Sequence, residues 1–405
     1  MNNPVLAIAI SNNDVYVGGI FFDAGGIANA DYIARWDGSA WNALGSGLNN
    51  PVEVITVSGS DVYVGGRFTN AGGNANADYI ARWNGSTWNS LGTGLGSYVY
   101  AIAVSGGNVY AGGDFFNAGG NANADYIARW NGSTWNSLGT GLGLNGPVYA
   151  IVITGSDIYI GGVFTNAGGN ANAYNIARWD GSTWNALGTG LNKWVFSIAI
   201  SGDDVYVGGA FTDVGSDTTV DYIARWDGST WNALGTGLNN TVVAITVSGS
   251  DVYVGGSFTD AGGNANADYI AYWDGNTWNA LSTGLNNSVY AIAASGNEVY
   301  VGGNFSNAGG NANANRIARW EDATISVGLP AFQACTIYPT VTSDLVYVKC
   351  ANENVVRVTV FDAYGKLRFN VLHLNQIDMS NESPGIYFLQ IQAEGKLTTM
   401  RVIKQ

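Results

Sequence analysis

The stretch Asp61-Val62-Tyr63-Val64-Gly65-Gly66 decides the fold, because near-copies of it recur six more times along the 405-residue chain. Measured at the first glycine of each copy, the spacings are 47, 47, 49, 47, 47 and 47 residues. These glycines are Gly18, Gly65, Gly112, Gly161, Gly208, Gly255 and Gly302. A fixed period of about 20–50 residues is typical of solenoids, propellers and repeat arrays.

Each period holds four apolar runs rich in β-branched and aromatic residues, and no window shows sustained helical periodicity. In the second repeat the runs cover residues 52–57, 62–68, 79–83 and 88–91. Short turn-forming segments separate the first pair of runs (58–61) and the last pair (84–87). Four short strands in about 45 residues is the size of a propeller blade.

We therefore predict an all-β fold in which residues 1–329 form a seven-bladed β-propeller with four-stranded blades. Residues 324–327 would supply the outer strand of the last blade. The predicted blades are 4–50, 51–97, 98–146, 147–193, 194–240, 241–287 and 288–329.

Thirteen of the 14 tryptophans occupy repeated positions, at the end of the third strand or the start of the fourth. We interpret them as wedges between adjacent blades, and a stacking platform for sugars is the alternative. Only Trp194 breaks the pattern. The double glycine indicates either a positive φ or a close backbone approach, which only a residue without Cβ allows.

The first 330 residues carry 9 Lys and Arg against 24 Asp and Glu, whereas residues 331–405 carry 7 against 6. Nucleic-acid binding needs a basic footprint, so an acidic repeat region makes nucleic acid an improbable partner. No apolar run is long enough for a transmembrane helix. The first residues show no signal peptide and match the join between repeats at 48–52, so we expect a signal peptide upstream of Met1.

The repeat unit, with Val-Tyr-Val-Gly-Gly-x-Phe-Thr-x-Ala-Gly-Gly followed by Ile-Ala-Arg-Trp-Asp-Gly-Ser-Thr-Trp-Asn-Ala-Leu-Gly, resembles the kelch-like repeats of galactose-oxidase-type propellers. It is also similar to the repeats of fungal cortical polarity-marker proteins and to bacterial delta-type repeats. The resemblance covers about four-fifths of the chain and implies a fold rather than a function.

The last seventy residues resemble the C-terminal sorting domain (type A) of substrates of the type nine (type IX) secretion system of Bacteroidetes. The matching pieces are Ile337-Tyr338-Pro339, Thr342-Ser343, Val358 through Lys366, Ile377-Asp378-Met379-Ser380, Gly385 through Ile391, Gly395-Lys396 and Val402 through Gln405. Thr340-Val341 depart from the usual Asn-Pro after Tyr-Pro.

This resemblance implies a small Ig-like β-sandwich over residues 330–405 that acts as a sorting signal. The chain would cross the outer membrane of a Gram-negative bacterium and become extracellular or surface-bound. The type IX machinery would be its partner, and attachment to surface lipopolysaccharide is one implied fate. A generic Ig-like binding module is the alternative.

Few residues suit catalysis or metal binding. The propeller region has no His or Cys, which excludes zinc sites and Ser-His-Asp or Cys-His catalysis there, along with the copper chemistry of galactose oxidase. His373 is the lone histidine, and Cys335 and Cys350 either form a disulfide or remain two free buried thiols. The loop Asn74-x-Asn76-x-Asp78 has a calcium-like spacing, although such clusters are far more often simple turns.

Candidate function lies where the repeats disagree, because the scaffold is what recurs. The variable positions are the residue before the first strand, the residue two further on, and the residue after the double glycine. Channel-mouth binding residues are predicted at Tyr98, Tyr100, Tyr149, Trp194, Phe196, Tyr290, Arg67 and Asp114. Ordinary blade packing is the alternative explanation for them.

From these observations we expect a non-catalytic, secreted or cell-surface binding protein with an unknown protein or glycan ligand and no cofactor. An extracellular carbohydrate-active enzyme is one alternative, although the candidate carboxylates Glu53, Asp217 and Asp221 form no evident pair. A purely structural or adhesive surface component is the other.

Overall fold

The computed structural model describes residues 1–139, 143–214, 220–321, 336–338, 341–349, 355–362, 366–372, 376–393 and 396–404. The chain divides into two compact units, Met1–Asp322 and Ala323–Gln405. Residues 324–327, where we predicted an outer strand, lie outside the described residues. No helix within these ranges is long and apolar enough to cross a membrane.

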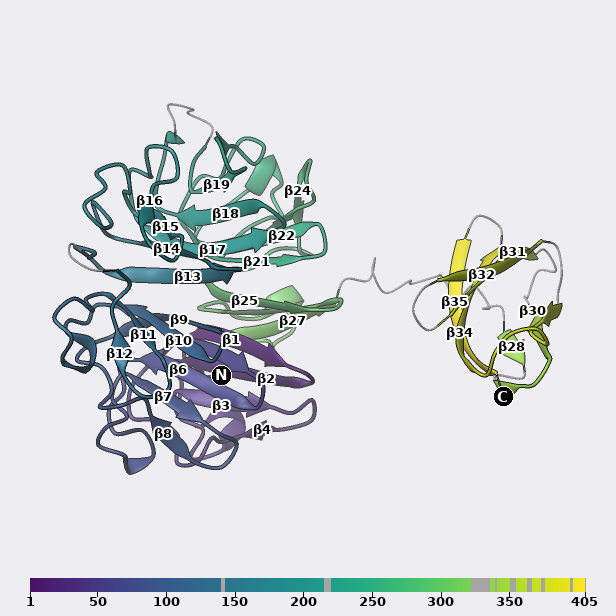
Figure 1. The fold of residues 1–405 in the computed structure, drawn as a ribbon, viewed down its shortest axis with the longest axis horizontal. Helices are drawn as coiled ribbons and strands as arrows, with labels where there is room; N and C mark the ends of the chain where they lie inside the picture. The colour runs from purple at the N-terminus through teal and green to yellow at the C-terminus, as the bar shows by residue number, and fades with distance from the viewer. Residues whose placement is uncertain are drawn as a thin grey trace. The chain divides into compact units, whose positions relative to one another are not determined.

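The first unit is built from β-sheets that repeat one four-stranded antiparallel pattern (Figure 1). Six sheets have four strands in chain order, and one more has three strands within the described residues. This confirms the all-β prediction and the blade-like repeat. The first strands of the sheets are β1 (Val5–Ser11), β5 (Val52–Ser58), β9 (Val99–Ser105), β13 (Val148–Thr154), β17 (Val195–Ser201), β21 (Val242–Ser248) and β25 (Val289–Ser295). The second strands are β2 (Asp14–Gly19), β6 (Asp61–Gly66), β10 (Asn108–Gly113), β14 (Asp157–Gly162), β18 (Asp204–Gly209), β22 (Asp251–Gly256) and β26 (Glu298–Gly303).

The two outer strands of each sheet are shorter. The third strands are β3 (Ile33–Trp36), β7 (Ile80–Trp83), β11 (Ile127–Trp130), β15 (Ile176–Trp179), β19 (Ile223–Trp226), β23 (Ile270–Trp273) and β27 (Ile317–Glu321). The fourth strands are β4 (Trp41–Asn42), β8 (Trp88–Ser90), β12 (Trp135–Asn136), β16 (Trp184–Asn185), β20 (Trp231–Asn232) and β24 (Trp278–Ala280). Short 3-10 turns lie between the second and third strands at Ala24–Gly26, Ala71–Gly73, Ala118–Gly120, Ala261–Gly263 and Ala308–Gly310. Both tryptophan sets therefore lie where the repeats predicted them.

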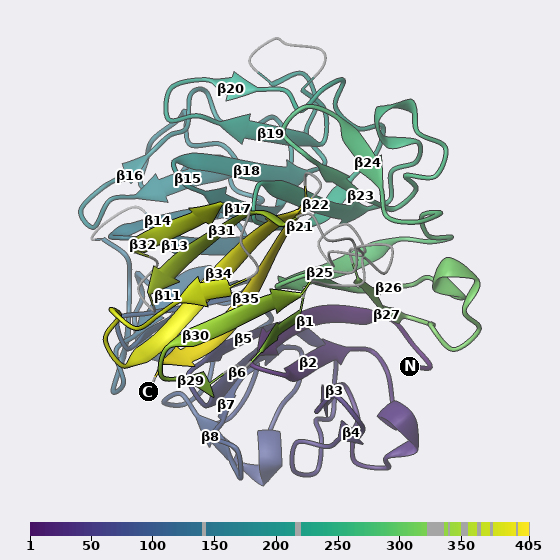
Figure 2. The same cartoon turned by 90° about the vertical axis from the view of Figure 1, so that its right-hand side faces the viewer.

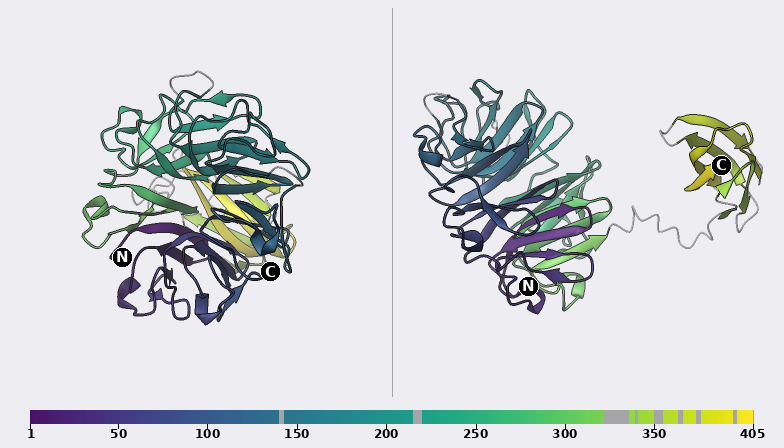
Figure 3. Two further views of the ribbon diagram at one scale, coloured as in Figure 1. Left: turned by 90° about the vertical axis from the view of Figure 1, so that its left-hand side faces the viewer. Right: turned by 60° about the horizontal axis from the view of Figure 1, so that its bottom comes forward.

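The first strand of each sheet is the innermost, since each contacts the first strand of the next sheet. The fourth strands β4, β8, β16, β20 and β24 lie at the periphery of this unit (Figure 2). In addition, β25 of the seventh sheet contacts β1 of the first sheet (Figure 3). This arrangement brings the starts of all seven inner strands together.

At the first glycine of each double glycine, a valine of the neighbouring sheet occupies the space that a Cβ would take. A Cβ on Gly65 would lie 2.6 Å from Cγ1 of Val99, and one on Gly302 would lie 2.5 Å from Cγ1 of Val5. Neither glycine has a positive φ. Of the two reasons that the sequence allowed for this glycine, the close approach is the one that applies.

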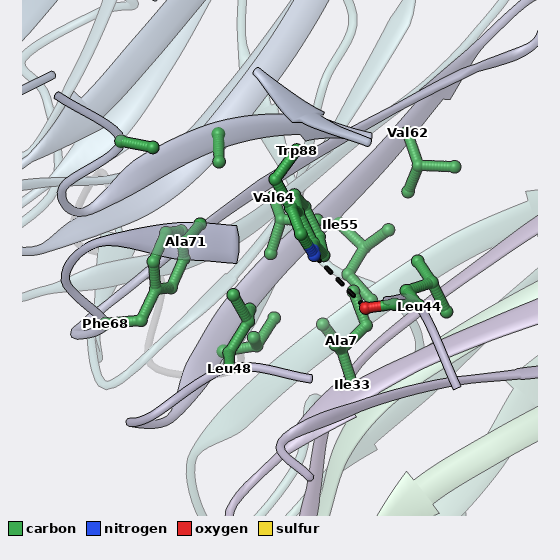
Figure 4. Close-up of a cluster of buried hydrophobic side chains, with 13 residues drawn as sticks. Ala7, Ile33, Leu44, Leu48, Ile55, Val62, Val64, Phe68, Ala71 and Trp88 are labelled. Atoms are coloured by element: carbon green, nitrogen blue, oxygen red, sulfur yellow. Dashed lines mark hydrogen bonds between the residues drawn. The ribbon is translucent and has the colours of Figure 1, made fainter. Parts of the chain in front are cut away.

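The tryptophans that start the fourth strands join neighbouring sheets. The indole N–H of Trp88 donates a hydrogen bond of 3.1 Å to the carbonyl oxygen of Leu44 in the preceding sheet (Figure 4). Trp135, Trp231 and Trp278 donate in the same way to Leu91, Leu187 and Leu234. The predicted wedge between blades thus carries a polar contact as well as an apolar one.

We predict that Trp88→Phe lowers the free energy of unfolding by about 1–3 kcal/mol, because the buried Leu44 carbonyl loses its donor. Urea denaturation followed by tryptophan fluorescence measures this change. Trp194→Phe is the matched control, since Trp194 is 50% exposed and should change stability by less than about 0.5 kcal/mol. Equal effects of the two substitutions would contradict the role given to the Leu44 contact.

Exposed Asp and Asn side chains stabilise the turns between third and fourth strands. Asp227 Oδ1 accepts hydrogen bonds from the backbone N–H groups of Ser229 (2.9 Å) and Thr230 (2.8 Å). These backbone hydrogen bonds lower the pKa of Asp227 well below its usual range, and the bond from Thr230 has the largest effect. The pKa of Asp274 is likewise lowered, to about 2, and the hydrogen bond from the Thr277 backbone N–H is the largest cause.

Acid should weaken the fold through these turns. A carboxyl group whose folded pKa is depressed stabilises the fold above its unfolded pKa, near 4, and loses that contribution as pH falls through the folded value. The free energy of unfolding should therefore fall between about pH 4 and pH 2. A variant with Asn at all four acidic turns (Asp37, Asp180, Asp227 and Asp274) should show a shallower fall, because Asn84 already makes the same backbone bonds without a charge. Urea midpoints at pH 4, 3 and 2 measure the slope; identical slopes would contradict the prediction.

The second unit contains two sheets around one core. One sheet has the order β28 (Thr336–Tyr338), β30 (Leu345–Lys349), β33 (Gln376–Asp378). The other has the order β29 (Val341–Thr342), β35 (Lys396–Lys404), β34 (Gly385–Ala393), β31 (Val355–Asp362), β32 (Leu367–Leu372). Alternating residues of both sheets are buried in one cluster: Val346, Val348, Val358, Val360, Ile377, Met379, Tyr387, Leu389 and Val402.

Candidate functional site

A β-bulge at the start of every inner strand leaves one variable, half-buried residue outside the ladder. In the third sheet Val99 pairs with Gly113 and Ala101 with Gly112, so Tyr100 between them has no partner in the ladder. The second glycine permits this, because a Cβ on Gly113 would lie 2.1 Å from the backbone oxygen of Tyr98. The bulge residues, one per sheet, are Leu6, Glu53, Tyr100, Tyr149, Phe196, Val243 and Tyr290.

A backbone hydrogen bond brings the residue after the double glycine to the same place. The N–H of Asp114 donates to the carbonyl oxygen of Tyr98 at 2.9 Å, and Arg67 donates to Pro51 at 2.9 Å. The same bond recurs in all seven sheets. We name the residues before the inner strands, the bulge residues and the post-glycine residues together the variable rim. The three sets of positions at which the repeats disagree thus form one surface.

Five of the predicted site residues form a continuous row of aromatic rings on this rim. The ring centroids of Tyr98 and Tyr100 are 6.4 Å apart, and those of Tyr100 and Tyr149 are 5.0 Å apart. The row continues from Tyr149 to Phe196 at 5.6 Å and ends at Trp194, 6.1 Å from Phe196. Trp194 and Tyr98, at its two ends, are 50% and 38% exposed.

The charged residues of the rim lie at the Tyr98 end of this row. The guanidinium of Arg67 lies over the ring of Tyr98, 5.1 Å from its centroid, and its Nε donates to Oε1 of Glu53 at 2.7 Å. The pKa of Tyr100 is raised to about 12, mainly by burial and secondly by the neighbouring Tyr149. Burial and the Asp114 carboxylate also raise the pKa of Tyr149. Both phenols therefore remain neutral hydrogen-bond donors at physiological pH.

The rest of the rim is smaller and more polar. Tyr290 on β25 is separated from the aromatic row by the bulge residue Val243 and makes no ring contact within the described residues. Ser257 and Ser288 share a hydrogen bond of 2.9 Å, and Arg316 donates to Asn304. The structure thus brings together Tyr98, Tyr100, Tyr149, Phe196, Trp194, Arg67 and Asp114, and leaves Tyr290 apart. Sequence reasoning missed Tyr79, whose ring lies 6.0 Å from that of Tyr98, because its position repeats in five sheets.

The loop with calcium-like spacing makes internal hydrogen bonds. Asn74 Oδ1 accepts from the backbone N–H of Asn76 at 3.0 Å, and Asp78 Oδ1 accepts from that of Asn70 at 2.7 Å. These oxygens stabilise turns. The parts of the chain that the structure describes contain no cluster of three acidic, His or Cys side chains fit for a metal. Cys335, Cys350 and His373 lie outside the described residues.

Comparison with solved structures gives several matches at low sequence identity. The extracellular domain of the hybrid two-component system BT4673 from B. thetaiotaomicron matches with a TM-score of 0.50 and 11% identity, over 100% of this chain and 57% of that one. PorZ, a bacterial surface component of the type-IX secretion system of Porphyromonas gingivalis, matches with a TM-score of 0.48 and 14% identity, over 100% and 59%. The computationally designed Ika8 protein matches with a TM-score of 0.47 and 18% identity, over 99% and 97%. This chain therefore spans little more than half the length of either bacterial protein.

The C-terminal residues give the firmest identification. No curated protein sequence matches the chain. Residues 336–405 match the model of the secretion system C-terminal sorting domain, which covers most of the second structural unit. The C-terminal part of the chain is therefore a type IX secretion sorting domain, and the chain carrying it is exported to the cell surface or beyond.

Proposed function

We propose that the chain is an exported, non-catalytic binding protein whose variable rim holds an extracellular glycan. The observation that carries this proposal is the aromatic row from Tyr98 to Trp194. Exposed aromatic faces pack against the apolar faces of sugar rings, and neighbouring polar groups fix their orientation. Arg67 and Asp114 provide such groups beside Tyr98 and Tyr149.

We further propose that the seven sheets close into a seven-bladed, kelch-like propeller. Support comes from the packing of β25 against β1 and from Gly302, which meets Val5 as Gly255 meets Val289. For the second unit we propose an Ig-like sandwich. Tyr387, near the start of β34, donates its hydroxyl proton to the carbonyl oxygen of Ser383 at 2.8 Å, as in the tyrosine corner of Ig-like folds.

A non-catalytic role agrees with the arrangement of the rim carboxylates. Glycoside hydrolysis needs two carboxyl groups facing one bond, one of them free to donate a proton. Glu53 is instead paired with Arg67 at 2.7 Å. Attachment of the exported chain to lipopolysaccharide belongs to the same proposal, since surface retention would keep a glycan-binding rim at the cell.

Binding to a glycan array tests the proposal. We expect Trp194→Ala and Tyr100→Ala each to weaken binding about tenfold, the equivalent of about 1.4 kcal/mol. The control is Tyr174→Ala, because Tyr174 is 41% exposed yet lies outside the rim. Equal binding by all variants would contradict the proposal. Turnover of a bound polysaccharide, abolished by one Asp→Asn change, would favour the enzyme instead.

A further inference from the structure

An acidic residue and an arginine pair across the second and third strands of most sheets. Arg82 donates from Nη1 to Oδ2 of Asp61 at 3.2 Å in the second sheet, and Arg319 donates to Glu298 at 2.7 Å in the seventh. The same pair recurs as Arg35–Asp14, Arg178–Asp157 and Arg225–Asp204. This ladder ion pair is part of the repeat and carries no functional information by itself.

The third sheet breaks the pair by losing its acid. Asn108 stands where five other sheets have Asp and the seventh has Glu. Arg129 forms no ion pair within the described residues, and its Nε is a buried donor without a hydrogen-bond partner. A buried polar group without a partner loses its hydrogen bonds to water and gains none in return, so a ligand that accepts this hydrogen bond would be stabilised by it.

Arg129 lines a cavity of about 480 Å³ between the third and fourth sheets. The polar part of its wall includes Asn121, Asn136, Ser137 and Ser182, and the ring of Trp179 lies on the opposite sheet. The neighbouring Leu138 is only half-buried, whereas its counterparts Leu44 and Leu91 are 2% and 3% exposed. The repeat between these two sheets is also the one with two extra residues, since Gly112 and Gly161 are 49 apart. The third sheet and its connection to the fourth thus hold both departures from the repeat, and Arg129 and Leu138 line the cavity between these two sheets.

We propose that this cavity binds a carboxylate-bearing sugar, with the guanidinium of Arg129 as the anchor for the carboxylate. A guanidinium and a carboxylate form paired, charge-assisted hydrogen bonds. In the third sheet Asn108 replaces the carboxylate of the repeat, so the carboxylate of the ligand would take over its role. Asn136 and Ser182 offer hydrogen bonds to hydroxyl groups, and Trp179 offers a face for the apolar side of a sugar ring. The site contains no rim residue and does not depend on the glycan proposed there.

Calorimetric titration of the 405-residue chain with glucuronate tests this site. We expect saturable binding that weakens at least about tenfold in Arg129→Gln and in Asn108→Asp, with little or no binding of glucose. Asn108→Asp is the sharper variant, because it restores the pair found in the other sheets and should preserve or raise the unfolding midpoint. Arg82→Gln, which breaks an ordinary ladder pair, should leave glucuronate binding unchanged.

NMR can observe the Nε–H proton of Arg129 directly, and the loss of its signal in Arg129→Lys assigns it. We expect its chemical shift to change when glucuronate is added. Unchanged affinity in Asn108→Asp would overturn the proposal, and so would equal binding of glucose. Equal affinity for acetate and glucuronate would overturn the assignment to a sugar. Each of these outcomes leaves glycan binding at the rim, read from Trp194→Ala, unaffected.

Discussion

Gly208→Ala should lower the free energy of unfolding by about 1–3 kcal/mol, because it places an atom where the next sheet already has one. The new Cβ would lie 2.4 Å from Cγ1 of Val242 and 2.9 Å from Cδ1 of Ile245. Val242 is fully buried, so its side chain cannot turn aside into solvent. Urea denaturation followed by circular dichroism gives the size of the loss.

The neighbouring Gly209→Ala should have the larger effect. Its Cβ would lie 2.1 Å from the backbone oxygen of Trp194, and backbone cannot rotate away as a side chain can. Relief requires the bulge at Phe196 to move, so on the proposed function this variant should also bind glycan more weakly. The control is Gly96→Ala, where the nearest atom would be 3.9 Å away and φ is not positive. If Gly96→Ala destabilised the chain as much as Gly209→Ala, close packing would not explain the double glycine.

Removal of residues 336–405 should abolish export, since these residues are the sorting domain. The shortened chain should accumulate in the periplasm of a host with a working type IX system, and little should reach the surface or the medium. Fractionation followed by immunoblotting measures the distribution. A host lacking the translocon provides the reference level for complete loss of export.

The reciprocal experiment moves residues 323–405 onto a periplasmic reporter. These residues form a compact unit of their own, so we expect the reporter to reach the surface in the same host. Retention of the reporter would mean that the first unit contributes to sorting. Export of the shortened chain at the wild-type level would mean that the signal lies elsewhere.

The repeat allowed much of the first unit to be predicted. Strand positions followed from the recurring Val-Tyr-Val-Gly-Gly and Trp residues, since a pattern seen seven times identifies the scaffold without any alignment. The β-bulge was not predicted, because the double glycine that permits it indicated only a positive φ or a close approach and not a register shift at Tyr100. The rim was therefore located by its variability, while the reason that its side chains meet appeared only in the structure.

At the Arg129 site the departure from the repeat could be seen in the sequence, but its structural meaning could not. Asn108 in place of Asp is visible in the sequence, yet nothing there indicates that its strand, β10, pairs with β11, which carries Arg129. The pairing in the sister sheets gives the substitution its meaning. The last seventy residues were predicted by resemblance, and there the order of short motifs was enough to identify the sorting domain.

The bulge has a consequence for how such a chain can change over generations. A residue outside the hydrogen-bonded ladder can be exchanged without altering the register on either side, and each of the seven inner strands has one such position. Unequal recombination between near-identical repeats would shuffle whole sets of three rim residues while the valine and glycine that join the sheets stay matched. The rim can thus vary in many combinations on a constant scaffold, and related chains should differ most at the rim and least in the sheets that carry it.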